Sequence, residues 1–152
     1  MAGVPTHADL TTDLFHTIGR FRRQVRRTAG RAFGGSVTES QAELLRLVGR
    51  QPGISVREAA DELGLAPNTT STLVTRLTAD ELLVRSVDPD DRRVGRLRLT
   101  ASAQQLADQT RTARRVALSH ALDQLDEHQI DSLTKGLAVI AEMTRLLKKE
   151  SE

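Results

Sequence analysis

The chain has 152 residues, contains no cysteine, tryptophan or tyrosine, and carries a formal net charge of only +2 at pH 7. Its length allows one domain with a real core, and the lack of cysteine excludes a disulfide framework, a thiolate metal site and a cysteine redox switch. The near-neutral charge excludes nucleic-acid binding through sheer charge, so any DNA affinity must be local.

The first part of the chain predicts a helix that packs against another helix. Residues 1–9 are expected to form a loose tail. From Leu10 onward apolar residues recur every three or four residues, at Leu10, Leu14, Ile18, Phe21 and Val25, which is the spacing of a helix–helix seam. Six arginines with no acid between them cover the other faces: Arg20, Arg22, Arg23, Arg26, Arg27 and Arg31. They form either a solvated basic face or a contact for phosphate or an anionic ligand.

A second helix is predicted after the break at Phe33-Gly34-Gly35-Ser36. Thr38 and Gln41 have the spacing of a capping box, and Pro52-Gly53 ends the helix. Its apolar residues are Leu44, Leu45 and Val48. Ile54 is expected to add a very short strand to a sheet further along the chain.

Two short helices joined by a tight turn come next, which is the pattern of a helix-turn-helix. Ser55 and Glu58 form a second capping box, and Gly64 stands where a left-handed residue ends the first helix. Pro67 suits the first position of the next helix because it has no N–H to lose. That helix is expected to turn Thr70, Leu73, Val74 and Leu77 inward.

The outer face of this second helix carries short hydrogen-bonding side chains and one long cation: Asn68, Thr69, Ser71, Thr72, Thr75 and Arg76. Asparagine pairs with adenine, threonine contacts thymine methyls or phosphates, and arginine reaches guanine or the backbone. The face is therefore either a reading surface for a DNA major groove or an ordinary solvated surface.

The segment after this helix favours DNA binding. Residues 82–87 and 94–99 are two short runs rich in branched apolar residues, and a charged turn containing Arg92 and Arg93 joins them. A hairpin with such a tip is a wing, whose arginines can enter a minor groove or bind phosphates. Thr100 then caps a long helix, expected from Ala101 to Leu125.

The last helix begins at Asp126, with Gln129 three residues later. Its apolar stripe repeats with a three-four rhythm at Ile130, Leu133, Leu137, Ile140 and Leu147. Both terminal helices thus carry seams, and only 38% of the residues are hydrophobic. Intertwined dimerisation is the economical interpretation. The absence of a signal peptide or a long apolar run indicates a cytoplasmic protein with no membrane contact.

Over nearly its whole length the chain resembles the MarR family of bacterial transcriptional regulators. The resemblance is carried by residues 37–45, by Glu58-Ala59-Ala60-Asp61-Glu62-Leu63-Gly64-Leu65, by Asp88, Asp91 and Arg93 in the wing, and by Leu99-Thr100. Four positions depart from the family pattern. Glu81 replaces a glycine, so the recognition helix is expected to end differently or one turn later; Asp90 weakens the wing's attraction for phosphate; Ala66 replaces a capping Ser or Thr; and Ala103 replaces a glycine.

The resemblance implies a mainly α fold with a small β wing, divided into an N-terminal dimerisation helix (1–36), a winged helix-turn-helix domain (37–100) and C-terminal dimerisation helices (101–152). It implies a homodimeric repressor that binds a pseudo-palindromic operator in double-stranded DNA and is released by a small aromatic or anionic ligand. Arg93 would enter the flanking minor groove while Asp91 holds the wing's shape. His16, Arg20 and His120 are the candidate ligand contacts.

The sequence gives weaker support to other functions. No nucleophile motif, Gly-rich phosphate loop or His-Glu-x-x-His spacing accompanies the histidines, so we expect neither an enzyme nor a cofactor. His120, Asp123 and His128 lack a convincing fourth metal ligand, and no metal site is expected. The main competitor is a winged-helix module for protein association or structured RNA, which shares the fold.

Overall fold

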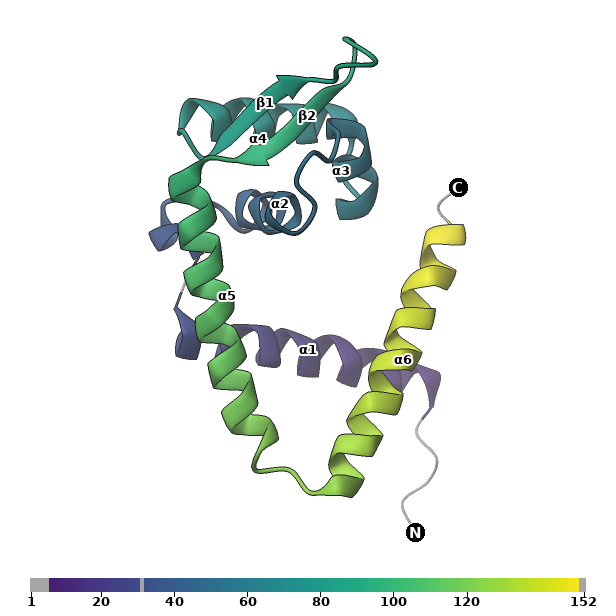
Figure 1. The fold of residues 1–152 in the computed structure, drawn as a ribbon. Coiled ribbons are helices and arrows are strands. Elements are labelled where there is room, and N and C mark those ends of the chain that lie inside the picture. The colour runs from purple at the N-terminus through teal and green to yellow at the C-terminus, as the bar shows by residue number, and fades with distance from the viewer. Residues whose placement is uncertain (1–5, 31, 151–152) are drawn as a thin grey trace. The chain divides into compact units, whose positions relative to one another are not determined.

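A computed structural model describes residues 6–30 and 32–150. The expected tail residues 1–5, and Arg31 of the basic segment, lie outside this range. The described elements are, in chain order, α1 (His7–Ala29), the 3-10 helix η1 (Ala32–Gly35), α2 (Glu39–Arg50), α3 (Val56–Leu63), α4 (Pro67–Ala79), β1 (Leu83–Val87), β2 (Gly95–Leu99), α5 (Ala101–Leu122) and α6 (Glu127–Lys149) (Figure 1). The chain forms two compact units, Met1–Arg114 and Arg115–Glu152.

The core of the first unit is built on α2. Its capping box forms as expected, with the Gln41 N–H donating to Thr38 Oγ1 at 3.3 Å. Four of its side chains are completely buried: Leu44, Leu45, Leu47 and Val48. They cluster with buried residues of α3, α4 and both strands, and each buried leucine contributes about 1.5–3 kcal/mol. The second helix predicted from the sequence is therefore the one on which α3, α4 and the wing pack.

The helix-turn-helix is α3 and α4. The Glu58 N–H donates to Ser55 Oγ at 3.1 Å, and the Ser55 N–H donates to Glu58 Oε2 at 2.8 Å. Gly64 ends α3 in the left-handed conformation, with φ 63° and ψ 33°. Pro67 is the first residue of α4, and Ala66 before it makes no side-chain cap. Thr70, Val74 and Leu77 are buried, which leaves the other face of α4 to solvent.

The wing is an antiparallel hairpin in which Leu83 pairs with Leu99 and Val87 with Gly95. The short strand expected at Ile54 takes the form of one bridge between Ser55 and Arg96. The Leu97 N–H donates to the Ile54 carbonyl at 2.9 Å, and the Gly53 N–H donates back to the Leu97 carbonyl at 2.8 Å. The wing is thereby hydrogen-bonded to the segment that leads into α3.

The end of α4 corrects one expectation. The helix ends at Ala79, without an extra turn, because Glu81 takes the left-handed conformation at φ 57°. The Leu82 N–H reaches the Leu77 carbonyl at 2.9 Å and the Glu81 N–H reaches the Thr78 carbonyl at 3.1 Å, which together make a Schellman motif. Glu81 thus adopts the geometry of a glycine and bears the steric cost of its Cβ.

The remaining helices differ from expectation mainly at their ends. α1 starts at His7 rather than Leu10, because Thr6 and Asp9 form a capping box that extends it. α5 stops at Leu122, three residues before the expected end. Ala103 on α5 is fully buried in the core cluster, so a methyl group fills the position where the family carries glycine.

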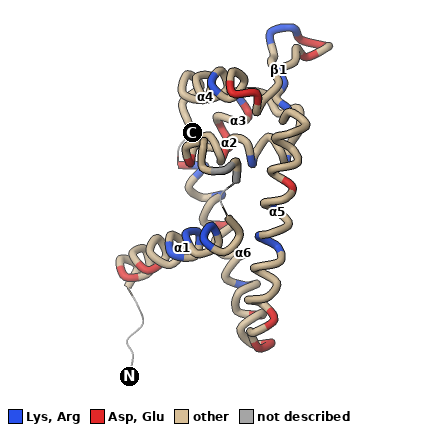
Figure 2. Tube along the Cα trace, turned by 90° about the vertical axis from the view of Figure 1, so that its left-hand side faces the viewer, with Lys and Arg blue, Asp and Glu red and all other residues tan. Residues whose placement is uncertain are grey.

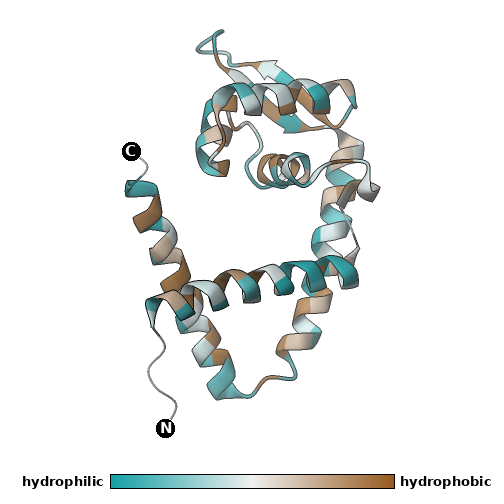
Figure 3. Ribbon diagram, turned by 180° about the vertical axis from the view of Figure 1, so that it is seen from behind, coloured by the Kyte–Doolittle hydropathy of each residue, from teal (hydrophilic) through white to brown (hydrophobic). Residues whose placement is uncertain are grey.

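Apolar side chains of α1 and α6 are uncovered. Neither helix contains a buried residue, and Phe15 and Leu147 are 75% and 63% exposed. Apolar residues recur along α6 in Figure 3. Among the described residues no helix has the length and apolarity that crossing a membrane requires.

We predict that Glu81→Gly stabilises the protein. Glycine adopts a positive φ without steric cost, and this gain exceeds the added entropy of the unfolded chain, giving a net effect of about 0.5–1 kcal/mol. The midpoint of thermal unfolding should rise by about 1–4 °C. Ala79→Gly, in the last turn of the same helix, is the matched control and should lower it. Equal destabilisation by both variants would contradict the explanation.

Candidate nucleic-acid interface

The exposed face of α4 contains all the predicted reading residues: Asn68, Thr69, Ser71, Thr72, Thr75 and Arg76. They are outside because Thr70, Val74 and Leu77 occupy the buried side of the same helix. Two of the hydroxyls donate to the carbonyl one turn earlier, Thr72 to Asn68 and Thr75 to Ser71, both at 3.0 Å. Their oxygens still have lone pairs to accept a hydrogen bond from a base or a bridging water.

Arg76 has a partner within its own helix. Its Nε lies 3.2 Å from Asp80 Oδ2, and both side chains are largely exposed. An exposed i,i+4 pair of this kind is weak, about 0.3–0.5 kcal/mol. The Arg76 guanidinium can therefore leave Asp80 for a stronger anionic partner at little cost.

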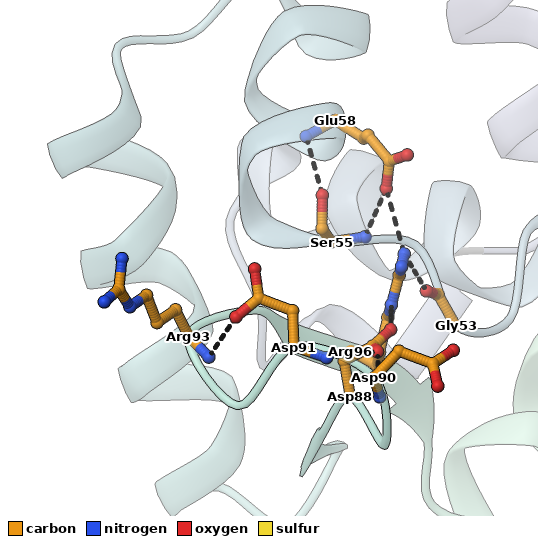
Figure 4. Close-up of polar contacts among 8 residues, drawn as sticks. All are labelled: Gly53, Ser55, Glu58, Asp88, Asp90, Asp91, Arg93 and Arg96. Carbon is orange, nitrogen blue, oxygen red and sulfur yellow. Dashed lines mark hydrogen bonds and ion pairs between the residues drawn. The ribbon is translucent and has the colours of Figure 1, made fainter.

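The turn of the wing is shaped by aspartates (Figure 4). Asp88 Oδ1 accepts the N–H groups of Asp90 and Asp91, at 2.8 and 3.0 Å, and Asp91 Oδ1 accepts the Arg93 N–H at 3.0 Å. These bonds fix the backbone that carries Arg92 and Arg93. The sequence predicts this role for Asp91, but Asp88 makes more of the contacts.

Arg96 joins the wing to the helix-turn-helix. Its Nε donates to Asp88 Oδ2 at 2.6 Å, and its Nη1 lies 3.3 Å from the Gly53 carbonyl and 3.4 Å from Glu58 Oε2. One guanidinium thus connects the wing turn with the capping box of α3. This role is not predicted from the sequence, although opposite charges on either side of a hairpin turn are a usable signal.

The wing arginines at the tip are differently placed. Arg92 and Arg93 are exposed, and neither forms an ion pair with any residue in the described part of the chain. In Figure 4 the Arg93 side chain extends away from the group around Arg96. Figure 2 shows basic and acidic residues together at this tip. The Asp88 and Asp91 carboxylates accept hydrogen bonds from backbone N–H groups and from Arg96. The guanidinium groups of Arg92 and Arg93 are therefore available to an external anion.

The candidate ligand residues are only partly brought together. His16 and Arg20 lie one turn apart on α1, where they line an open hollow of about 690 Å³ with Phe21 and neighbouring residues. His120 is an exposed residue of the second unit. Among the described residues no three His, Asp or Glu side chains gather as a metal site would require.

The Asp88–Arg96 contact changes the titration of the wing. The hydrogen bond from Arg96, followed by those from the Asp90 and Asp91 N–H groups, lowers the pKa of Asp88. The hydrogen bonds from Ser55 lower the pKa of Glu58 as well. Both carboxylates therefore remain ionised down to lower pH than ordinary acids.

We predict that Asp88→Asn reduces the acid sensitivity of the fold. Because the folded-state pKa of Asp88 is depressed, its stabilisation is fully present above the unfolded pKa near 3.9 and disappears as pH falls through the lower folded value. Thermal unfolding of the wild type and the variant between about pH 6 and pH 2.5 measures this. Asp90→Asn is the control, since it removes a carboxylate outside the Arg96 network. Identical pH profiles for all three proteins would refute the assignment.

The sequence model described as the MarR family matches residues 36–94, which include α2, α3, α4, β1 and the turn of the wing, but not β2. No curated protein matches the sequence. Solved structures do resemble the chain throughout. That of Streptococcus pneumoniae FabT in complex with DNA has a TM-score of 0.81 at 17% identity, covering 93% of this chain and 99% of the other.

Two further structures agree. A MarR family protein from Bacillus stearothermophilus has a TM-score of 0.73 at 20% identity, with 91% of this chain and 94% of the other covered. The transcriptional regulator PcaV from Streptomyces coelicolor, in complex with its natural ligand, has a TM-score of 0.63 at 22% identity, with 93% and 98% covered. Residues 36–94 thus match the MarR family model, and over nine-tenths of its length the chain has the winged helix-turn-helix fold of these solved structures.

Proposed function

We propose that the protein is a homodimeric, sequence-specific DNA-binding repressor that a small-molecule ligand releases from its operator. The observation that supports this most is the combination, on one compact unit, of an exposed hydrogen-bonding face on α4 with unpaired arginines at the wing tip. A module for protein association alone would not need both. Such a role lies in the cytoplasm of a bacterium and requires no catalysis.

In this proposal α4 reads bases. Asn68, Thr69 and Thr72 lie in its first two turns, the part of a recognition helix that meets base edges in the major groove. Ser71 lies between Thr69 and Thr72, and Arg76 lies one turn further along; both would contact the groove or its phosphates. The side chains at the start of the helix are short, so the helix can approach the groove floor closely.

In this proposal the wing contacts DNA outside the major groove. Arg92 and Arg93 can enter the flanking minor groove or bind phosphates without breaking an existing ion pair. Asp91 and Asp88 hold the backbone beneath them. Asp90, also at the tip, opposes phosphate and keeps the wing's net attraction modest.

Dimerisation is inferred from the uncovered seams of α1 and α6. In α6, Leu133, Leu137 and Leu147 are 43%, 57% and 63% exposed, an unusual surface unless another helix covers it. A two-fold dimer would present two copies of α4 to half-sites about 34–36 Å apart, so the operator should be pseudo-palindromic. The resemblance to the structure of FabT in complex with DNA supports binding to DNA.

Ligand release is proposed from the family and from the resemblance to PcaV, which was solved with its natural ligand. His16 and Arg20 share the hollow along α1 and supply a hydrogen-bonding ring and a cation. A small aromatic or anionic molecule suits both groups. His120 is retained as a third candidate contact.

We predict that substitutions in α4 and in the wing affect DNA binding differently: the first should change base preference, and the second should change affinity for all sequences. Asn68→Ala should relax preference at one symmetric pair of bases, whereas Arg93→Ala should weaken many sites alike. Each lost phosphate contact lowers the slope of log affinity against log salt by about one unit per subunit, or about two per dimer. Binding isotherms over a salt series, on duplexes selected from the gene's own upstream region, measure both effects.

Flank-swapped operators provide the control, since narrow A-T flanks concentrate negative potential and should make the Arg93→Ala loss largest there. If Arg93→Ala leaves affinity and salt slope unchanged on every duplex, the wing does not contact DNA. Failure of the wild type to select any sequence would favour the association module.

We also predict that Leu137→Asp or Ile140→Asp disrupts the dimer and DNA binding together, because a charge would be buried in the interface. Light scattering and gel shifts measure the two properties on the same samples. Ala138→Asp is the control, as it adds the same charge beside the polar side of α6. A wild type that is monomeric at micromolar concentration would contradict the proposal.

A further inference from the structure

Arg85, in the first strand of the wing, carries a charge that the chain does not match. Its side chain is exposed, and it forms no ion pair with any residue in the described part of the chain. The nearby carboxylates of Asp88 and Asp91 already accept hydrogen bonds from Arg96 and from backbone N–H groups. The guanidinium of Arg85 is therefore available to an external anion.

The register of the hairpin determines where the Arg85 side chain begins. Arg85 lies opposite Leu97, and opposed residues of antiparallel strands point to the same face of the sheet. Gly95 belongs to that face as well, two residues before Leu97. Since the Leu97 N–H and carbonyl bond to the Ile54 carbonyl and the Gly53 N–H, Arg85 and Leu97 form a non-hydrogen-bonded pair, in which side chains approach closely.

The guanidinium of Arg85 lies across the backbone of Gly95. A Cβ added to Gly95 would be 2.9 Å from both Cζ and Nη2 of Arg85, and closer still to its Nε. The head group thus occupies the space that a side chain at position 95 would fill. The φ of Gly95 is not positive, so this strand residue is glycine for the sake of space and not for its backbone conformation.

We propose that Arg85 is a further contact of the wing with DNA phosphate, and that Gly95 positions it. Gly95 is the first residue of β2, next to the turn that carries Arg92 and Arg93. Lying over this glycine, the guanidinium is directed from β1 toward the tip of the wing. Its fork matches two phosphate oxygens, and a head group already placed on a flat surface loses less freedom on binding.

This inference rests on the proposed function and deepens it, because it assigns the contact to the same wing. A phosphate contact carries no sequence information. Arg85 should therefore add affinity on every duplex and leave base preference to α4. The surface with which the wing contacts DNA would then include β1 as well as the turn.

Binding isotherms over a salt series, on the duplexes used for Arg93→Ala, test the contact. Arg85→Met keeps most of the aliphatic stem and removes the donors, so it should lower the salt slope by about two units per dimer. Between about 50 and 200 mM salt the wild type should then lose about tenfold more affinity than the variant does. Arg98→Met is the matched control: Arg98 lies opposite Val84, on the other face of the same hairpin, and its loss should leave the slope unchanged.

Gly95→Ala tests the positioning. The added methyl group displaces the guanidinium but does not strain the strand, so the midpoint of thermal unfolding should stay the same or rise. Affinity for DNA should fall by about fivefold, because two guanidinium groups per dimer must then be ordered on binding. In the Arg85→Met background the same substitution should leave affinity unchanged, which a double-mutant cycle measures.

The outcomes distinguish this inference from the function on which it rests. If Arg93→Ala lowers the salt slope and Arg85→Met does not, the role of Arg85 is overturned and the proposed function stands. An equal effect of Arg98→Met also overturns that role, since total charge would explain both. An equal effect of Gly95→Ala with and without Arg85 overturns the positioning. A wild type that binds no duplex overturns the proposed function and this inference together.

Discussion

The burial of α2 is the constraint on which the first unit depends. Leu44, Leu45, Leu47 and Val48 are completely inaccessible, and they form one cluster with Ala59 of α3, Val74 and Leu77 of α4 and Leu97 of the wing. Because these elements share one core, α4 cannot turn relative to the wing without opening it. The shared core consequently fixes the position of the exposed face of α4 relative to the wing tip. A surface that contacts the major groove with one element and the flanking minor groove with the other requires this.

The wing is stabilised by polar contacts as well as by packing. The wing has two strands, and a lone hairpin of that size is marginal in water. Here the bridge between Ser55 and Arg96 adds a one-residue third strand on the free edge of β2, and the Arg96 guanidinium links Asp88 to the Gly53 carbonyl and Glu58. The same Glu58 caps α3, so the start of the helix-turn-helix and the turn of the wing share one network.

Much of this could be predicted because its signals are local. The boxes Thr38–Gln41, Ser55–Glu58 and Asp126–Gln129 each mark a helix start, and Gly64 and Pro67 mark the turn. The box at Thr6–Asp9 carries the same signal, but it precedes the apolar row, and the start expected from that row is therefore too late. The position of Glu81 attracts notice in the sequence, but its positive φ was not predicted, because a glutamate rarely adopts one. In the structure this conformation occurs together with the Leu82–Leu77 hydrogen bond and with the bond from the Thr100 hydroxyl to the Glu81 carbonyl at 2.9 Å. The Asp88–Arg96 contact depends on the register of the hairpin, and the grouping of Arg114 with Arg26 and Arg46 depends on three separate helices.

The arginines show why residue type alone does not locate function. Arg96 has its charge matched by Asp88 and Glu58, and it serves the fold. Arg92 and Arg93 lie close to Asp88 and Asp91 along the chain, yet those two carboxylates are occupied by backbone N–H groups and by Arg96. The charges of Arg92 and Arg93 are exposed, so they carry little desolvation penalty, as is expected of a surface that binds phosphate. Arg114 is the opposite case, since its charge is partly buried and its Nε has no acceptor among the described residues. A buried guanidinium N–H that lacks an acceptor costs stability. The state of pairing of each guanidinium, and not the number of arginines, therefore separates the residues that hold this fold from those available to a partner.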